Sequence, residues 1–210
     1  MSAAPVEFWF DFGSPYGYLM AERIDALAAA HGRAVRWRPM LLFAVLRQLG
    51  MPPPLAHAPK HDYLLLDIER SARQLRLPYR HPSHFPLATP LPGRMFHALA
   101  ARDPAAAVAF ARDALRAAFR DDAALDDADL VARLAARHDP RDAAQLREAA
   151  AAEPARRALA DAVAEAAARQ VFGSPFVHID GEPFFGADRL PQIEARLAGE
   201  LAPPPRPETP

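Results

Sequence analysis

The stretch FWFDFGSPYGY, residues 8–18, indicates how the chain begins to fold. Its phenylalanines stand at alternate positions, which is the period of a β-strand, and Trp9 between them predicts partial burial of the second face as well. Gly-Ser-Pro ends this strand, and helical spacing of apolar residues follows over residues 15–31. Ser and Pro are favoured residues at a helix N-cap and first turn, so Ser14 is expected to cap the helix. The stretch therefore predicts a strand over residues 5–12 that leads directly into a helix.

A second strand pattern follows the first helix closely. Gly after His31 is typical of a helix C-terminus, and residues 34–41 alternate again between apolar and charged side chains. A β-α-β unit this short predicts two parallel strands joined by a right-handed crossover.

Strand character returns only near the other end of the sequence. Residues 176–179 and 183–186 are strand-like, and Asp180-Gly181 between them is a hairpin turn signal. Asp188 is expected to open a last helix that runs to residue 201. Neither end can bury a sheet alone, so we expect the two ends to join as a four-stranded mixed sheet flanked by helices.

The middle of the chain, residues 42–170, shows no strand pattern. Asp-Pro at residues 103–104 and 139–140 predicts helix starts, with Asp as N-cap and Pro in the first turn. Helical spacing recurs in segments separated by proline-bearing loops, at residues 41–49, 60–76, 93–101, 104–119, 127–138, 140–151 and 154–170. The middle is therefore interpreted as a helical insertion into an α/β fold.

Composition excludes several classes of function. The formal net charge of -1 gives no electrostatic case for binding nucleic acid or an anionic membrane. No apolar run is long enough to span a bilayer, and the N-terminus lacks the pattern of a signal peptide, so a cytoplasmic protein is expected. The chain contains no cysteine, which excludes disulfides, thiolate metal sites and dithiol redox chemistry by the protein itself. Among the histidines, His57 and His61 lack a third ligand, so no metal site is expected.

Ser14 is the residue best placed to take part in chemistry. A helix N-terminus presents unpaired N–H groups that favour an anion, and a capping hydroxyl can still donate its own proton. That arrangement suits a bound thiolate or oxyanion. The alternative is that Ser14 only caps its helix. A hydrolase nucleophile is disfavoured, because the surroundings are not Gly-x-Ser-x-Gly.

Several motifs resemble a known family. The order of elements resembles the thioredoxin fold of the DsbA-like superfamily, and FDFGSPYGY, residues 10–18, resembles the active-site start of 2-hydroxychromene-2-carboxylate isomerases and kappa-class glutathione transferases. GSPFVHIDGEPFFGADRL, residues 173–190, resembles the family's Pro-strand-hairpin-helix ending. KHDYLLLDIER, residues 60–70, is a weaker match to a helix of the insertion. FPLATP, residues 85–90, departs from the family because Ala88 stands where Asn is common.

The resemblance implies a fold and a division of the chain. Residues 5–41 and 171–201 would form a discontinuous thioredoxin-like domain. Residues 42–170 would form the helical insertion, and residues 202–210 a disordered tail. A homodimer is implied by the family and by no feature of this sequence.

The resemblance also implies glutathione as the cofactor. Oxidative members carry Cys-x-x-Cys where this chain has Ser14, so the thiol must come from outside, and the family supplies it as glutathione. Ser14 would donate a hydrogen bond to the glutathione sulfur and lower the thiol pKa. Pro175 matches the family's cis-proline, and the backbone of Ser174 would pair with the cysteinyl backbone of glutathione.

The remaining site residues follow from the same resemblance. Phe185, Gly186 and Ala187 match the stretch that holds the γ-glutamyl end. Asp188 would bind the ammonium group there and Arg189 would support it, although a plain N-cap is the alternative for Asp188. Lys60, the one lysine of the chain, would reach the glycine carboxylate or an acidic substrate.

The implied function is a glutathione-dependent isomerase that acts on 2-hydroxychromene-2-carboxylate or a related small aromatic carboxylate. A kappa-like glutathione transferase is the first alternative, and a non-catalytic thioredoxin-fold binding protein is the second. The substrate pocket is expected in the proline-rich loop at residues 78–92. The sequence does not choose between the candidate pocket residues Tyr16, Tyr63, Tyr79 and Phe85.

Overall fold

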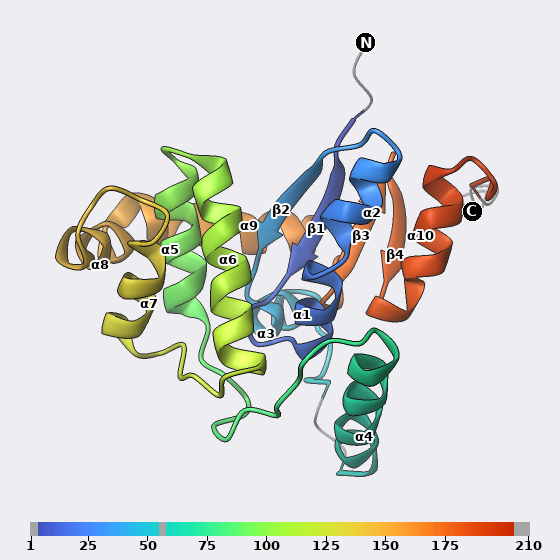
Figure 1. Ribbon diagram of the computed structural model, residues 1–210, viewed down its shortest axis with the longest axis horizontal. Coiled ribbons are helices and arrows are strands. Elements are labelled where there is room, and N and C mark those ends of the chain that lie inside the picture. Colours follow the sequence, from blue (N-terminus) through green and yellow to red (C-terminus); the bar gives the residue numbers. More distant parts are fainter. Residues whose placement is uncertain (1–3, 55–57, 204–210) are drawn as a thin grey trace.

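The sheet joins the two ends of the sequence. The computed structural model describes residues 4–54 and 58–203, and its strands lie in the order β2-β1-β3-β4 (Figure 1). β1 pairs with β2 in parallel, while β3 runs antiparallel to both β1 and β4. The predicted mixed sheet is therefore confirmed. Its strands are β1 (Val6–Phe10), β2 (Val35–Pro39), β3 (Phe176–Ile179) and β4 (Glu182–Phe185).

Helices make up the regular structure described between β2 and β3, so the predicted helical insertion is confirmed as well. In Figure 1, α5 to α8 lie together beyond the β2 edge, while α4 lies apart from them below the sheet. The helices of this segment are α3 (Leu42–Gln48), α4 (Ala58–Gln74), α5 (Pro90–Ala100), α6 (Pro104–Phe119), α7 (Ala128–Ala135), α8 (Ala143–Ala151) and α9 (Glu153–Ala168). The others are α1 (Pro15–Ala21), α2 (Ile24–Ala30) and α10 (Leu190–Leu197).

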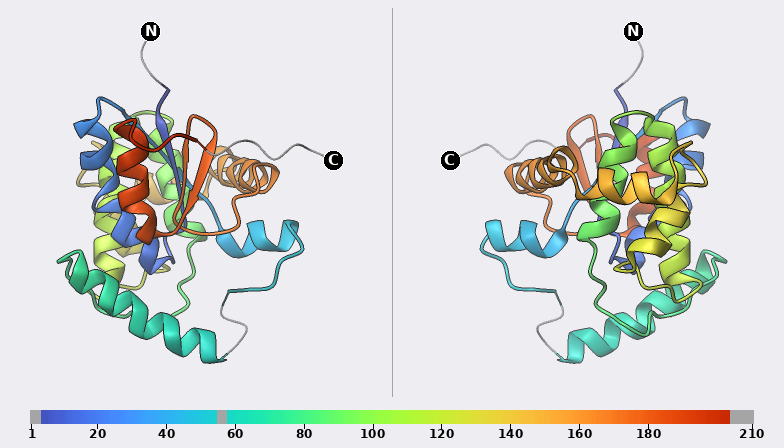
Figure 2. Two further views of the ribbon diagram at one scale, coloured as in Figure 1. Left: turned by 90° about the vertical axis from the view of Figure 1, so that its right-hand side faces the viewer. Right: turned by 90° about the vertical axis from the view of Figure 1, so that its left-hand side faces the viewer.

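Both faces of the sheet are covered. Figure 2 shows α1, α2 and α10 on one side of the strands and α9 on the other. Phe8 and Phe10 point into the larger core, where both rings pack edge-on against Trp37 of β2. Trp9 points the opposite way into a smaller cluster with Val163 of α9. Trp9 is fully buried, so its second face is better covered than the partial burial that the sequence predicts.

Several predicted helix boundaries are wrong. The segment 15–31 is two helices, since α1 ends at Ala21 and α2 begins at Ile24, while the apolar spacing continues across the break. Asp139 is not an N-cap, because its carboxylate binds Arg141 and α8 instead begins after Asp142, which forms a capping box with Gln145.

Asp188 does not open the last helix either. It lies inside a single 3₁₀ turn, η1 (Ala187–Arg189), and its carboxylate pairs with the Arg189 guanidinium at 2.6 Å. α10 begins directly after η1, at Leu190, without a side-chain cap, and it ends at Leu197 rather than at the predicted residue 201.

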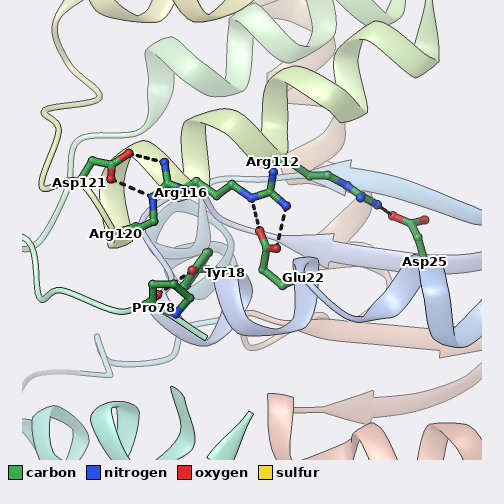
Figure 3. A network of polar contacts seen from close by, with 8 residues as sticks. All are labelled: Tyr18, Glu22, Asp25, Pro78, Arg112, Arg116, Arg120 and Asp121. Atoms are coloured by element: carbon green, nitrogen blue, oxygen red, sulfur yellow. Dashed lines mark hydrogen bonds and ion pairs between the residues drawn. The ribbon is translucent and has the colours of Figure 1, made fainter. Parts of the chain in front are cut away.

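Ion pairs attach the insertion to the helices that follow β1. Figure 3 shows α6 lying over α1 and α2, with two arginines that reach across to acidic side chains. Arg116 makes two hydrogen bonds to the Glu22 carboxylate, at 2.7 and 2.8 Å, and Arg112 pairs with Asp25. Tyr18 of α1 donates its hydroxyl to the Pro78 carbonyl at 2.7 Å. The arginine pairs hold α6 against α1 and α2, and the Tyr18 bond fixes α1 relative to the segment that leads out of α4.

A buried histidine predicts how stability depends on pH. His178 of β3 is 7 % exposed, and burial lowers its pKa, helped by Arg169 and opposed by Glu7. The folded state therefore binds fewer protons than the unfolded state, and this contribution to stability is lost as the pH falls below the ordinary histidine value of about 6.5. Denaturant titrations should show the free energy of unfolding falling with acid, less steeply in His178→Gln than in the wild type. His84→Gln, at an exposed loop position, is the matched control, and equal slopes in all three proteins would contradict the prediction.

Two predictions fall outside the described residues. His57 lies in the gap before α4, and most of the predicted tail, from residue 204, follows the last described residue. Within the described part of the chain, no helix is long and apolar enough to cross a membrane.

Candidate functional site

The two Gly-Ser-Pro segments line one cavity. The cavity has a volume of about 780 Å³ and lies beside the N-terminus of α1. Its walls come from α1, the segment before β3, η1, α4, and the loop between α4 and α5. Every predicted site residue lines it, from Ser14 and Lys60 to the run Phe185 to Arg189. The structure thus brings together residues that lie up to 175 positions apart.

Ser14 caps α1 as predicted. Its hydroxyl oxygen accepts a hydrogen bond from the Gly17 N–H at 3.0 Å. The hydroxyl itself donates to the backbone carbonyl of Ser174 at 2.8 Å. Gly17 leaves room for this contact, because a Cβ there would lie tightly against both serines, 3.1 Å from Ser14 Cβ and 3.3 Å from each hydroxyl oxygen. The proton of Ser14 is therefore directed at the second Gly-Ser-Pro segment.

Ser174 and Pro175 form the opposite wall. The peptide bond between them is cis, as the family resemblance implies. The Ser174 hydroxyl accepts a hydrogen bond from the Asp11 N–H at 2.9 Å, so the two segments are joined by a pair of buried hydrogen bonds. The Pro175 carbonyl accepts from the Gly186 N–H at 3.1 Å, which ties this wall to the end of β4. A second cis bond, Phe85–Pro86, was not predicted.

Asp11 also lines the cavity, although the sequence motifs did not indicate it. It is 6 % exposed at the end of β1, and three donors converge on its carboxylate. The Gly13 N–H and the Thr89 hydroxyl donate to Oδ1, at 2.8 and 2.7 Å, and the Leu42 N–H donates to Oδ2 at 2.7 Å. Burial raises the pKa of Asp11, and these hydrogen bonds oppose the rise. In the sequence, an acidic residue between two phenylalanines indicates such a site, because a carboxylate is buried only when hydrogen bonds satisfy it.

The end of β4 and the turn that follows it contribute an aromatic ring and a carboxylate to the cavity lining. The Phe185 ring lies over Gly173, where an added Cβ would come within 2.0 Å of it, so glycine is required there unless the ring moves. Gly186 has φ +104, and an added Cβ would meet Asp188 Oδ1 at 2.4 Å. The Asp188 side chain is 69 % exposed and pairs with Arg189. Its carboxylate is thus available at the cavity rim.

α4 forms the wall that faces α1. The Tyr16 hydroxyl donates to Asp67 Oδ2 at 2.7 Å, which ties α1 to α4. Burial raises the pKa of Tyr16, and the hydrogen bond to Asp67 raises it further, so the Tyr16 hydroxyl stays protonated near neutrality. Lys60 and Tyr63 lie further along the same wall and are exposed. The described ion pairs give Lys60 no carboxylate partner, so its ammonium group is open to an anionic ligand.

The loop after α4 supplies the remaining wall. Of the four aromatic candidates, Tyr16, Tyr63 and Phe85 line the cavity. Tyr79 is not among the lining residues; its ring stacks on Phe119, and its hydroxyl lies 2.9 Å from His81 Nδ1. His81 lines the cavity in its place, and burial lowers its pKa. Ala88, where the family commonly has Asn, is exposed and lies outside the cavity lining.

No group of three or more His, Cys, Asp or Glu residues that could hold a metal occurs among residues 4–54 and 58–203. The site consists of the Ser14 hydroxyl, the cis Ser174–Pro175 segment and charged side chains around a large cavity. A domain model described as the DSBA-like thioredoxin domain matches residues 5–198. The chain belongs to this family.

Relatives of this DSBA-like thioredoxin protein include isomerases and transferases. It is 26 % identical to the 2-hydroxychromene-2-carboxylate isomerase of Pseudomonas sp. (strain C18), over 92 % of this chain and 90 % of that one. It is also 26 % identical to glutathione S-transferase kappa 2 of Caenorhabditis elegans, over 98 % of this chain and 96 % of the relative.

A solved structure has the same fold. A 2-hydroxychromene-2-carboxylate isomerase structure superposes with a TM-score of 0.78 at 26 % identity, covering 92 % of this chain and 94 % of the other. The family resemblance inferred from the two Gly-Ser-Pro stretches is therefore confirmed.

Proposed function

We propose that this chain is a glutathione-dependent isomerase of 2-hydroxychromene-2-carboxylate, yielding trans-o-hydroxybenzylidenepyruvate, or of a related aromatic-degradation intermediate. The observation that carries the proposal is Ser14 at the N-terminus of α1, opposite Ser174–Pro175 on a cavity of about 780 Å³, in a chain without cysteine. A thioredoxin-like site built this way has no thiol of its own. The isomerase and kappa transferase relatives support glutathione as the source of the thiol.

The residues around the cavity fit glutathione. Its ammonium and two carboxylates need one acidic and two cationic or N–H-donating partners, and the cavity offers Asp188, Arg189 and Lys60. The Ser174 carbonyl is suited to an extended peptide segment, as an added strand requires. Gly186 leaves space beside Asp188 that a Cβ would fill. When bound, glutathione would supply a thiolate able to add reversibly to a conjugated double bond and so permit its rotation.

The chain's own residues would bind the substrate and glutathione, orient them and polarise the thiol. Ser14 would stabilise negative charge at the sulfur by donating its hydroxyl proton, assisted by the N–H groups of the first turn of α1. Lys60 would attract a carboxylate, and Phe85 and Leu87 would pack against an aromatic ring. The reaction involves no net oxidation, which suits a site that holds no protein thiol.

A test of the proposal measures how much glutathione is consumed. The purified protein is mixed with 2-hydroxychromene-2-carboxylate and a much smaller amount of glutathione, and both the isomer and the free thiol are followed. We expect product to exceed the glutathione supplied while the free thiol stays constant. Loss of one thiol per product would instead show the kappa-like transferase. Glutathione that neither shifts the melting temperature nor supports turnover would favour the non-catalytic binding protein.

The remaining expectations belong to the same proposal. The division into a thioredoxin-like domain at residues 5–41 and 171–201 and an insertion at residues 42–170 stays a prediction. So do the homodimer and the cytoplasmic location.

A further inference from the structure

The loop between α4 and α5 is held in place on both sides of His81. Four hydrogen bonds to neighbouring elements hold it, two before His81 and two after it. They join the Tyr18 hydroxyl to the Pro78 carbonyl at 2.7 Å, the Arg80 N–H to the Phe119 carbonyl at 2.7 Å, and the N–H and hydroxyl of Ser83 to Asp122 Oδ1 at 2.7 and 3.0 Å. The His81 side chain therefore leaves from a preorganised backbone, as a functional side chain requires.

Tyr79 determines which nitrogen of His81 carries the proton. Its ring stacks on Phe119, and its hydroxyl lies 2.9 Å from His81 Nδ1. Among residues 4–54 and 58–203 the hydroxyl has no other hydrogen bond, so its single proton is satisfied when it is donated to Nδ1. Burial lowers the pKa of His81, so the ring is neutral near pH 7. A neutral ring that accepts at Nδ1 carries its own proton on Nε2.

The Nε2 edge of the His81 ring faces the cavity. His81 lines the cavity, whereas Tyr79, which holds the Nδ1 edge, does not. In the described part of the chain, Nε2 has no hydrogen-bond partner and is not one of the buried polar atoms left unpaired. The Nε2–H group is therefore open to a ligand in the cavity.

The same loop connects His81 to the N-terminus of α1. The Phe85 ring lies 4.9 Å from the His81 ring, between ring centres. Leu87 reaches Gly13, where an added Cβ would lie 3.5 Å from the Leu87 carbonyl oxygen. All of these residues line the cavity, and Gly13 directly precedes Ser14. His81 thus stands on the wall that adjoins Ser14, beside the aromatic ring expected to pack against the substrate.

We propose that His81 is a catalytic residue whose Nε2–H donates to the conjugated carbonyl oxygen of the substrate, and that Tyr79 is the positioning residue that keeps the proton on Nε2. Reversible thiol addition forms one sulfur–carbon bond from the double bond and moves an electron pair onto that oxygen. Reversal returns the pair, so His81 keeps its proton throughout. A fixed N–H donor stabilises the charge as it develops. This role rests on the proposed function, because it names the donor for that substrate.

Nitrogen-15 NMR of histidine-labelled protein tests the donor without any reaction. The His81 signal is identified by its absence from His81→Leu. At about pH 8, above the ordinary histidine pKa of about 6.5, the wild type should carry the proton on Nε2. Phenylglyoxylate, an aromatic 2-oxo acid without an alkene, should shift this resonance and bind His81→Leu roughly threefold to tenfold more weakly than the wild type. A proton on Nδ1, or a resonance that saturating phenylglyoxylate leaves unchanged, would overturn the proposal.

Turnover separates a donor from a packing role. His81→Gln keeps an N–H near the Nε2 position, His81→Asn places its N–H nearer Nδ1, and His81→Leu has none. At saturating substrate, kcat should fall about 100-fold in His81→Leu and His81→Asn, and His81→Gln should recover most of that loss. His84→Gln is the matched control, because His84 lies on the same loop and outside the cavity lining. Tyr79→Phe should lower kcat roughly tenfold alone and cause no further loss in His81→Leu, since Tyr79 acts through His81.

The outcomes distinguish this role from the proposed function. If the wild type turns over and His81→Leu matches it, or His81→Gln is as slow as His81→Leu, the role of His81 is refuted and the function stands. A further loss on adding Tyr79→Phe to His81→Leu would refute the positioning role of Tyr79. A wild type that shows no isomerase turnover refutes the proposed function, and the role of His81 falls with it. Should His81→Leu fold poorly, His81→Gln against His81→Asn gives the same contrast between two polar side chains.

Discussion

Under the proposed function, replacing Ser14 with alanine should lower isomerase turnover by about 100- to 1,000-fold, the loss that follows removal of one preorganised donor to a developing negative charge. The hydroxyl lies at the start of α1 and faces the cavity wall formed by Ser174. Without it, the bound thiol loses a donor to its charged form, so its pKa rises. Turnover is measured at saturating glutathione as a function of pH. The rate of the variant should recover at higher pH, where the thiolate forms without help.

The same substitution also removes a helix cap, and the two effects must be separated. Loss of an N-cap alone costs about 1 kcal/mol of stability. Asp127→Ala is the matched control, because Asp127 caps α7 by accepting from two backbone N–H groups and does not line the cavity. It should lose about 1 kcal/mol of stability and keep its turnover. Unchanged turnover of Ser14→Ala at saturating glutathione would refute the role given to Ser14, whatever its melting temperature.

Local rules predict much of this architecture, because each strand and cap is set by neighbouring residues. The alternating phenylalanines of β1 define a buried face, and Asp180-Gly181 forms the expected turn with positive φ at both residues. Ser14 is an N-cap for the same local reason. Where two local signals compete, as at Asp139-Pro140 and Asp142, the capping box decided the start of α8, since it satisfies two backbone groups reciprocally.

The site depended on contacts between distant segments, which local patterns do not report. His81 lines the cavity while Tyr79 packs on Phe119, and nothing in their proline-rich loop distinguishes the two side chains in advance. The apolar spacing likewise gives no sign of the break between α1 and α2. At this break, Arg23 donates a hydrogen bond to the Leu75 carbonyl of a distant segment. The bond from Ser14 to Ser174 joins residues 160 positions apart. The family resemblance placed Ser14 and Ser174 in one site, and the structure shows how they are bonded.

Asp11 shows the consequence of such contacts for stability. Its carboxylate collects donors from three separate segments, at Gly13, Leu42 and Thr89. Asp11→Ala leaves one buried donor, the Thr89 hydroxyl, and two partly buried N–H groups without their acceptor. A buried donor without an acceptor costs about 1–3 kcal/mol and a partly buried one costs less, so we expect the free energy of unfolding to fall by about 3 kcal/mol. Asp11→Asn keeps an oxygen for two of the donors but turns an amide NH₂ toward the third. Its loss should be about 1–2 kcal/mol. Both values are measured by denaturant titration at neutral pH.

The large expected effect of Asp11 on stability comes from its burial, and an exposed aspartate serves as the control for burial. Asp103 also accepts from two backbone N–H groups, but it is exposed at the start of α6, where water can replace it. Asp103→Ala should therefore cost about 1 kcal/mol. Asp11→Ala should in addition weaken glutathione binding, because the Asp11 side chain accepts from the Gly13 N–H in the turn before Ser14. If Asp11→Ala loses stability but binds glutathione as tightly as the wild type, Asp11 supports the fold alone and does not position the site.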